Sequence, residues 1–432
     1  MNHSSPPSGS LPRPNIAAWV GLDWADQQHQ VCLYDVATSQ VESYRLEQSA
    51  EALQEWLGQL RARYGGAKVA IVLEQSRGPV LYGLMSCDFV VLYPVNPESL
   101  ANYRKAFFPS GAKSDPSDAA LLMEMVRKNP ERFRLWMPGD AETRSLQLLT
   151  EGRRKLVNQK TSLTNQLTSL LKGYYPQALE WAGELDSEQA CDFLEKWPTL
   201  ADLQKVKPAR LRQFYLRSGR PRPDRLEQRL QQIRQALPLT SDPAVVLSGS
   251  MMVLALVAQL RPLLAAIAQF DQQIALLFRK HPDRLLFESL PGAGAVLAPR
   301  LLAAFGADRD RFQSAIEMQQ LSGIAPVTEK SGSLEWVHWR LACPKFLRQT
   351  FQEFADHSRK YSDWAKAYYQ QQRTRGKKHQ AAVRSLAYKW IRIMFRCWKD
   401  HRPYDSGIYL SALSDRRSPL LASIMALPKS AQ

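Results

Sequence analysis

Short apolar segments alternate with an amphipathic segment between residues 17 and 95, and this alternation limits the fold of the 432-residue chain more than any other feature. Runs of strand length cover residues 19–23, 30–35, 69–73 and 89–95. The segment between the second and third runs has helical spacing instead, with Leu53, Trp56, Leu57 and Leu60 on one face. The sequence therefore predicts an α/β domain with a mixed sheet, whose second strand pairs back on the first.

Four carboxylates lie at the ends of these predicted elements. Asp23 ends the first strand, and Glu74 follows a later one. Asp115 is expected to cap a helix that begins at Pro116, which places Asp118 on the same face. Clustered carboxylates repel unless cations screen them, and two Mg²⁺ ions can stabilise the attacking and leaving oxygens of a phosphodiester. The ordered set favours such a metal site, although each acid taken singly also fits a helix cap or a turn.

Beyond residue 138 the pattern becomes helical. Positions three or four residues apart from Leu146 to Tyr174 form a mostly apolar seam, interrupted by Arg153 and Lys160, and residues 241–280 repeat the theme. The predicted seam of the second helix contains Leu247, Met251, Leu254, Ile267, Phe270, Ile274 and Leu277. Two such helices form either a coiled-coil arm for dimerisation or spacing, or part of an internal bundle, and the sequence leaves both possibilities open.

Basic residues exceed acidic ones, with 57 Lys and Arg against 41 Asp and Glu and a formal net charge of +16. Half of this excess lies in residues 205–235, where Phe214 and Tyr215 are interleaved with ten basic side chains. A polyanion, and nucleic acid first, is the expected partner, and a basic enzyme with a scattered surface excess is the alternative. Within residues 205–235 we favour phosphate contact over a solvated charged face.

Other features exclude whole classes of protein. The five cysteines are far apart and form no CxxC pair, which argues against a disulfide scaffold and a zinc ribbon and favours a reducing compartment. Residues 1–15 are rich in Ser and Pro and are expected to form a disordered leader, not a secretory signal. The most apolar run, near residues 251–268, is interrupted by Gln259 and Arg261, so no membrane segment is expected and a cytoplasmic location is predicted.

Two motifs stand out nearer the carboxyl terminus. A Pro-Gly-Ala-Gly turn with Gly292 and Gly294 precedes a helix, which is typical of a helix-hairpin-helix element that holds a phosphate on backbone N–H groups. A tight helix–helix connection is the alternative. Ser331 lies between Lys330, which can stabilise phosphate charge, and Gly332, which permits close backbone approach. No GxSxG motif or His-Asp pair is evident, and alone Ser331 fits a turn better than a nucleophile.

Residues 368–402 carry ten basic side chains against one acid, with Leu386, Trp390, Ile393 and Trp398 as apolar anchors. This pattern indicates a basic amphipathic helix that meets phosphates, and a membrane-surface helix is the competing interpretation. The predicted nucleic-acid contacts are Gly292, Gly294, Lys330, Arg210, Arg212, Arg217, Arg220, Arg222, Arg373, Arg375, Lys377, Lys378 and Arg384.

Taken together, these segments resemble the insertion-sequence transposases of the one-ten family, which combine four acids with a serine. The resemblance covers residues 20–150 and 287–404. The matching motifs are Gly-Leu-Asp at 21–23, Leu-Glu at 73–74, Tyr-Pro-Val-Asn-Pro at 93–97, Lys-Ser-Asp-Pro-Ser-Asp-Ala at 113–119, Leu-Pro-Gly-Ala-Gly at 290–294, and Gly-Ile-Ala-Pro at 323–326 followed by Ser-Gly at 331–332.

The resemblance implies an RNase H/RuvC-like domain whose metal site is Asp23, Glu74, Asp115 and Asp118. It also implies that Ser331 becomes covalently joined to DNA, in a dimer or tetramer where one subunit's serine completes another's acidic site. The implied partners are donor and target double-stranded DNA and a noncoding guide (bridge) RNA, whose pairing carries the specificity. The expected protein is thus a bacterial, nucleoid-associated recombinase.

Two rival functions remain open: a metal-dependent junction resolvase that uses water as its nucleophile, and a non-catalytic nucleic-acid-binding protein. The predicted division is a leader (1–15), a RuvC-like domain (16–138), a coiled-coil arm (139–284), a mostly helical serine domain with the helix-hairpin-helix element (285–404) and a tail (405–432). The arm contains a basic insert, residues 175–240, which makes the chain longer than the family pattern and to which no function is transferred.

Overall fold

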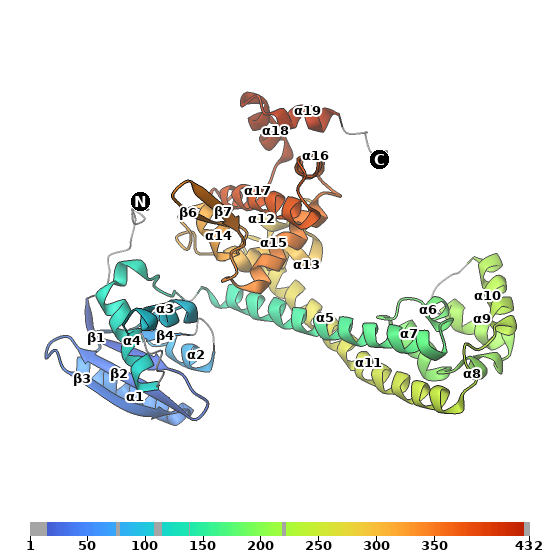
Figure 1. Ribbon diagram of the computed structural model, residues 1–432, viewed down its shortest axis with the longest axis horizontal. Coiled ribbons are helices and arrows are strands. Elements are labelled where there is room, and N and C mark those ends of the chain that lie inside the picture. Colours follow the sequence, from blue (N-terminus) through green and yellow to red (C-terminus); the bar gives the residue numbers. More distant parts are fainter. Residues whose placement is uncertain (1–14, 75–77, 108–114, 138, 218–221, 427–432) are drawn as a thin grey trace. The chain divides into compact units, whose positions relative to one another are not determined.

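The computed structural model describes residues 15–74, 78–107, 115–137, 139–217 and 222–426. The chain divides into two compact units, residues 1–138 and 139–432, each with its own cores. Figure 1 shows a sheet with flanking helices in the first unit and an almost entirely helical second unit.

A five-stranded mixed sheet forms the centre of the first unit, in the order β3-β2-β1-β4-β5. The strands are β1 (Ile16–Asp23), β2 (Gln28–Asp35), β3 (Val41–Glu47), β4 (Lys68–Leu73) and β5 (Val90–Pro94). β1, β4 and β5 are parallel, whereas β2 and β3 form an antiparallel meander on β1. The predicted mixed sheet and the return of the second strand onto the first are confirmed, and the topology is consistent with a RuvC-like domain.

Helices cover both faces of this sheet because alternate strand residues point to opposite sides. Ile71 packs in one core with α1 (Ala50–Tyr64) and α2 (Pro79–Leu84), while Val72 packs in the other with α3 (Pro97–Phe107) and α4 (Asp115–Lys128). A short 3₁₀ helix, η1 (Pro130–Arg132), follows α4. α1 is capped by Ser49, whose side chain accepts a bond from the Ala52 N–H, and ends at Gly65 with φ of 57°.

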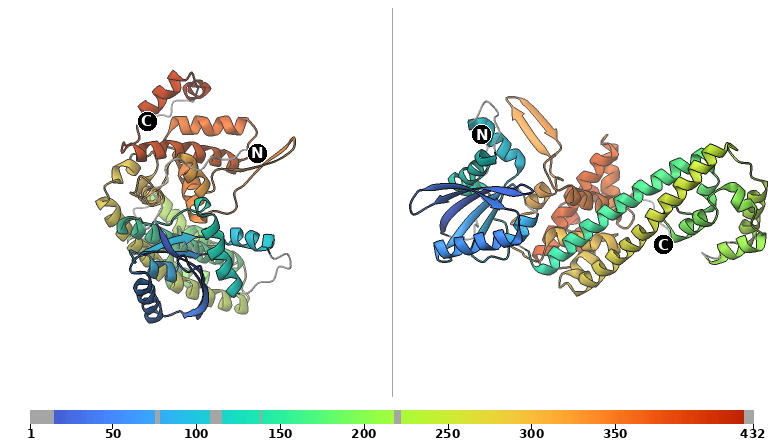
Figure 2. Two further views of the ribbon diagram at one scale, coloured as in Figure 1. Left: turned by 90° about the vertical axis from the view of Figure 1, so that its left-hand side faces the viewer. Right: turned by 90° about the horizontal axis from the view of Figure 1, so that it is seen from below.

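Two long helices, α5 (Ala141–Tyr174) and α11 (Pro243–Lys280), lie side by side in the second unit (Figures 1 and 2). They are antiparallel, because the start of α5 and the end of α11 share one core and their other ends share another. Glycine permits the close approach: a Cβ at Gly152 would lie 2.8 Å from the Phe270 ring, and one at Gly249 would lie 2.7 Å from the Tyr174 ring.

The predicted seam is wrong in the first half of α11. Leu247 and Met251 are each 63% exposed and Leu254 is 39% exposed, whereas Val253 and Leu260 are buried. The buried face passes through Gly249, at which the helix meets Tyr174. Apolar side chains surround this part of α11, so helical periodicity alone does not identify the packed face.

Five shorter helices fold against the far ends of α5 and α11 and enclose a separate core, the distal core. They are α6 (Ala178–Trp181), α7 (Glu188–Lys196), α8 (Leu200–Gln204), α9 (Pro208–Arg217) and α10 (Pro223–Gln235). The basic insert is therefore a folded helical module and not a loop. Phe214 and Tyr215, the aromatic residues interleaved with its basic side chains, are buried in the distal core.

By length and composition, α11 is apolar enough to cross a membrane. Its middle residue Arg261, however, forms ion pairs with three carboxylates of α7: Glu188 at 2.5 Å, and Asp192 and Glu195 at 2.8 Å. These pairs and the packing along α5 are contacts of a helix inside a folded domain.

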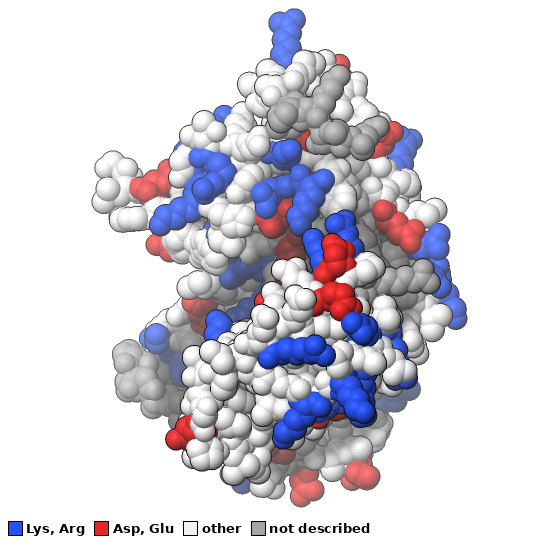
Figure 3. Space-filling view, turned by 90° about the vertical axis from the view of Figure 1, so that its right-hand side faces the viewer, with Lys and Arg blue, Asp and Glu red and all other residues white. Residues whose placement is uncertain are grey.

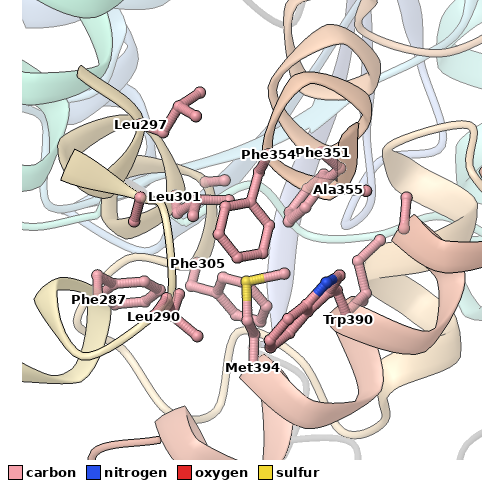
Figure 4. Packing of buried hydrophobic residues seen from close by; sticks show 14 of the residues in the cluster. Phe287, Leu290, Leu297, Leu301, Phe305, Phe351, Phe354, Ala355, Trp390 and Met394 are labelled. Carbon is pink, nitrogen blue, oxygen red and sulfur yellow. The ribbon is translucent and has the colours of Figure 1, made fainter. Parts of the chain in front are cut away.

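The rest of the second unit surrounds the largest core, shown in Figure 4, where Phe287, Phe305, Phe354, Trp390 and Met394 interdigitate. Its helices are α12 (Arg284–Glu288), α13 (Gly294–Phe305), α14 (Ala315–Leu321), α15 (Lys345–Ser358), α16 (Asp363–Thr374), α17 (His379–Lys399), α18 (Ser406–Asp415) and α19 (Pro419–Met425). The last two occupy the tail and bury Leu413 and Leu420. A hairpin of β6 (Val327–Ser331) and β7 (Leu334–His338) projects from these helices (Figure 2).

Candidate functional site

The carboxyl ends of the two central strands bring the first two predicted acids together. β1 and β4 run parallel with Leu22 opposite Leu73, so Asp23, which follows Leu22, and Glu74, which follows Leu73, come next at neighbouring positions. Parallel neighbours leave a sheet at the same edge, which is where open α/β sheets place their ligands. We call this part of the sheet, with the first turn of α4, the acidic edge.

α4 reaches the acidic edge because Gly21 has no side chain. A Cβ at residue 21 would overlap the carbonyl oxygen of Ala119 and lie 2.8 Å from the amide nitrogen of Met123. The helix therefore packs directly on the backbone of β1, two residues before Asp23. This contact brings Asp118, the neighbour of Ala119, to the same end of the strand.

Asp115 is the first residue of α4, and not the residue before it as we had expected. Helix termini shift by a residue between assignments, so Asp115 and Asp118 still lie one turn apart. The side chain of Asp115, and the neighbouring motif residues Lys113 and Ser114, lie outside the part of the chain that the structure describes.

Asp118 forms a buried ion pair with Arg104 of α3. The Arg104 Nε atom donates to the Asp118 Oδ1 atom at 2.8 Å, the Arg104 Nη2 atom lies 2.6 Å from the same oxygen, and the two side chains are only 15% and 3% exposed. Both contacts are made to Oδ1, and neither is made to Oδ2. A carboxylate this deeply buried requires a cation, and Arg104 provides one.

Carboxylate oxygens converging on one edge are the donors that a hard divalent cation prefers, so the residue types and their placement fit such an ion. Among the residues that the structure describes, no three of His, Cys, Asp and Glu are grouped closely enough to hold a metal ion. Asp118 is engaged by Arg104, and the Asp115 side chain is not described. The acidic edge thus supplies candidate ligands, which are not gathered into a finished coordination shell.

Ser331 is the last residue of β6 and is exposed to solvent. It pairs with Leu334 across a two-residue turn, Gly332-Ser333, in which Gly332 has φ of 61°. A positive φ at the first turn residue is the pattern of a type II′ hairpin, which favours glycine there. The hairpin projects from the helices (Figure 2), and its register places Ser331 beside the turn at the tip.

We call this hairpin the serine hairpin. Its charged residues near Ser331 form ion pairs from one strand to the other. Lys330, predicted to contact phosphate, lies 2.9 Å from the Glu335 carboxylate on β7. His338 Nε2 lies 2.7 Å from Glu329 Oε1, and this bond raises the pKa of the imidazole. Both pairs are solvent-exposed, so an incoming phosphate can compete for Lys330 at little cost.

The glycine-rich turn between α12 and α13 is open on one side only. A Cβ at Gly292 would lie 2.6 Å from the Tyr361 ring, and the Gly292 carbonyl accepts a bond from His357 Nδ1 at 2.7 Å. By contrast, no atom lies within 4 Å of a Cβ placed on Gly294, the first residue of α13. Any phosphate held by this turn would therefore approach from the Gly294 side.

The basic residues of the insert lie on the surface of α9 and α10. Arg210, Arg217 and Arg222 are exposed, and Arg212 forms a forked pair with Glu227 at 2.7 Å. Arg220 lies outside the described residues. Figure 3, in which the side of the molecule that carries α8, α9 and α10 faces the viewer, shows blue side chains spread over this face with red ones among them.

The second basic region falls at the junction of α16 and α17. Arg373, Arg375, Lys377 and Lys378 are exposed there, whereas Arg384 is half-buried against Trp339.

Periodicity did not single out Arg104, which pairs with an acid fourteen residues away. Gly21 was noted in the Gly-Leu-Asp motif, but the sequence did not reveal that α4 packs directly on it.

Comparison with known proteins identifies transposase domains in both units of the chain. A family model of DEDD transposases matches residues 20–176, and a model of the IS116/IS110/IS902 transposase family matches residues 284–370. The first covers the acidic edge and all of α5, and the second includes Ser331. A DEDD domain indicates dependence on divalent metal in general.

Relatives share sequence along most of the chain. A mini-circle transposase candidate for IS117 of Streptomyces coelicolor is 29% identical over 90% of this chain and 96% of its own length. A 43.6 kDa protein of insertion element IS110 from the same organism is 26% identical over 92% and 99%. A 42 kDa protein of IS900 from Mycobacterium paratuberculosis is 25% identical over 89% and 96%. The chain therefore belongs to the IS110 family of insertion-element transposases, enzymes that act on DNA.

Proposed function

We propose that this transposase is an RNA-guided, site-specific recombinase that cuts and rejoins DNA through Ser331. The observation that carries the proposal is the pairing of two features: an acidic edge built by β1, β4 and α4, and a serine at the tip of an exposed hairpin. Asp23, Glu74, Asp115 and Asp118 are the proposed metal ligands, with Mg²⁺ as the proposed ion and two ions per site.

In the proposed step the Ser331 Oγ atom attacks a DNA phosphorus atom. An oxygen–phosphorus bond to serine forms, the bond from phosphorus to one DNA oxygen breaks, and the serine proton is passed to that leaving oxygen. Strand exchange reverses the attack, so phosphodiester energy is conserved and no nucleotide is hydrolysed. Bound divalent cations supply charge stabilisation at the attacking and leaving oxygens. The four carboxylates would hold those cations and orient the phosphate.

The nucleophile and the acids belong to different compact units of the chain. We therefore propose a homo-oligomer, a dimer or tetramer, in which the serine hairpin of one subunit meets the acidic edge of another. Exposure of the hairpin supports this arrangement, because Ser331, Gly332 and Ser333 are all open to solvent.

Nucleic acid would be held by the two basic regions, on the arm and at the junction of α16 and α17. Phosphate contacts of this kind do not read sequence, so a separate reader is required. We propose a noncoding guide RNA of the element as that reader, pairing with donor and target DNA in the bacterial nucleoid. Sequencing the RNA that co-purifies with the protein tests this part: a discrete RNA encoded beside the gene is expected, and a random RNA population would contradict it.

Covalent trapping tests the serine. A DNA substrate nicked beside the cleavage site should accumulate a protein–DNA adduct stable in detergent, which Ser331→Ala abolishes while DNA binding survives. Ser333→Ala is the matched control, because Ser333 lies in the same exposed turn and should still give the adduct. An adduct that persists in Ser331→Ala would exclude the Ser331 assignment. Cut DNA without any adduct, from wild-type protein, would instead identify a resolvase that uses water.

A further inference from the structure

Two arginines, Arg348 and Arg384, meet around Trp339 at the foot of the serine hairpin, and a third, Arg340, is the next residue in the chain. Arg384 of α17 lies with its Cζ atom 3.6 Å from the centre of the Trp339 ring, and Arg348 of α15 lies 5.5 Å from it. Arg340 directly follows Trp339, and its carbonyl accepts a bond from Arg348. We call Arg340, Arg348 and Arg384 the arginine cluster.

Neighbouring groups fix the orientation of this cluster. Arg348 Nη2 also contacts the Cys343 Sγ atom at 2.6 Å and the Leu341 carbonyl at 3.3 Å. Gly323, in the Gly-Ile-Ala-Pro motif, leaves room for them: a Cβ there would overlap Cys343 Sγ and lie 3.0 Å from Arg348 Nη2. The motif glycine thus clears the space in which the guanidinium of Arg348 lies.

No carboxylate in the described part of the chain forms an ion pair with any of the three. Other half-buried arginines of the chain do have acids, as Arg104 has Asp118, Arg300 has Glu353 and Arg309 has Asp283. In addition, the Nε atoms of Arg340, Arg348 and Arg384 are buried without a hydrogen-bond partner among the described residues. Burial and the nearby charge of Arg348 lower the pKa of Arg384 to about 10.

Gathering like charges away from water is costly unless an anion compensates them. The fold itself provides no such anion among its described residues, so the compensating charge comes with a ligand. Guanidinium groups bind the paired oxygens of a phosphate through forked hydrogen bonds. We propose that the arginine cluster is a binding site for a backbone phosphate of the DNA strand on which the serine hairpin acts, an assignment that rests on the proposed function.

The phosphate bound there is not the one that Ser331 attacks. β7 separates the two ends of the hairpin by five residues, a length of about 17 Å at the usual rise of a strand. This length corresponds to roughly five base-pair steps at 3.4 Å per step along the axis of a DNA duplex. The cluster therefore anchors the strand a few nucleotides from the reacting phosphate and sets its register relative to the serine.

The test compares Arg384→Gln and Arg348→Gln with a matched control, Arg359→Gln. Arg359 is also half-buried on α15 and lies 4.1 Å from the Tyr369 ring, but it has an acid partner, Asp356. The probe is a fluorescein-labelled 30-base-pair DNA duplex, and affinity is measured by anisotropy over a series of NaCl concentrations. The full-length Ser331→Ala protein is used, so that binding is observed without chemistry.

Each cluster variant should bind the duplex five- to tenfold more weakly at 0.1 M NaCl. The slope of log K against log [NaCl] should become less negative by about 0.9, which corresponds to the loss of one phosphate contact. Arg359→Gln, which removes the same charge, should change affinity less than twofold. The melting temperature of the cluster variants should be unchanged or higher, because an uncompensated buried charge has been removed.

Equal affinity of cluster variants and control would overturn the proposal, as would a fall in melting temperature that accounts for the lost binding. A parallel titration with an RNA duplex of the same length distinguishes a DNA site from an RNA site. If only RNA binding weakens, the site serves RNA and the DNA assignment is wrong. These outcomes are independent of covalent trapping, which tests Ser331 in the otherwise wild-type chain.

Discussion

The backbone of Gly21 in β1 touches the backbone of Ala119 in α4, leaving no space for a side chain between the strand and the helix. This contact determines where the acidic edge forms, because Asp23 lies two residues after Gly21 and Asp118 directly precedes Ala119. The close approach of these two backbones therefore determines how the carboxylates are arranged.

Gly21→Ala should therefore displace α4. A Cβ would overlap the Ala119 carbonyl oxygen, and neither backbone can yield cheaply, so we expect a loss of roughly 3 kcal/mol in the free energy of unfolding. Urea denaturation measures this loss. Gly58→Ala is the control, since a Cβ on that helical glycine meets no atom within 4 Å and should stabilise the protein slightly. Equal stability of the two variants would show that the contact is dispensable.

Arg104→Gln should leave the buried Asp118 carboxylate without its cation. Removing one partner of a buried ion pair typically costs about 3 kcal/mol or more. If Asp118 is a metal ligand, saturating Mn²⁺ should recover part of this loss by supplying positive charge, whereas wild-type protein should gain less. Thermal unfolding with and without Mn²⁺ measures both effects. The same loss with and without the ion would argue against Asp118 as a ligand.

The serine hairpin should be more ordered at low pH. The bond to Glu329 raises the pKa of His338 above its usual 6.5, so the pair stabilises the hairpin fully below pH 6.5 and loses this contribution as pH rises through the higher folded value. Hydrogen-exchange protection factors of β6 and β7 amides should accordingly be larger at pH 6 than at pH 9. Glu329→Gln should remove the difference. Equal protection in wild-type protein at both pH values would contradict the expectation.

Gly249→Ala should weaken the arm, although alanine normally favours a helix. The new Cβ would lie 2.7 Å from the Tyr174 ring, which cannot easily move because its hydroxyl donates to the Pro198 carbonyl at 2.7 Å. We expect a loss of about 1 to 3 kcal/mol from overpacking. Gly173→Ala, on α5 with open space around it, should instead gain up to about 1 kcal/mol. The difference in melting temperature between the two variants tests this directly.

The sequence predicted the first unit well because its strands are apolar runs of the right length and its first helix has an apolar face with helical spacing. It did not reveal β3, in which Leu46 is the one buried residue and polar side chains interrupt the pattern. Edge strands bury little, so their composition resembles that of loops.

The site was predictable only as far as it lies at the ends of elements. Asp23 and Glu74 could be placed from strand ends alone, whereas Arg104 and the arginine cluster depend on which helices meet in space. The packed face of α11 was mispredicted for a related reason: a helix that is apolar on all sides carries little information about its register. In the tail, the burial of Leu413 and Leu420 likewise became visible only through their neighbours.

The two long helices of the arm have a mechanical consequence. α5 is a single helix of 34 residues, about 50 Å long, and both it and α11 are packed into a core at each end. Two helices packed together in this way resist bending and move as one rigid body. A force applied at the basic end, where we propose that nucleic acid binds, would reach the helices around the serine hairpin as a rotation, without any chain of intermediate contacts to relay it.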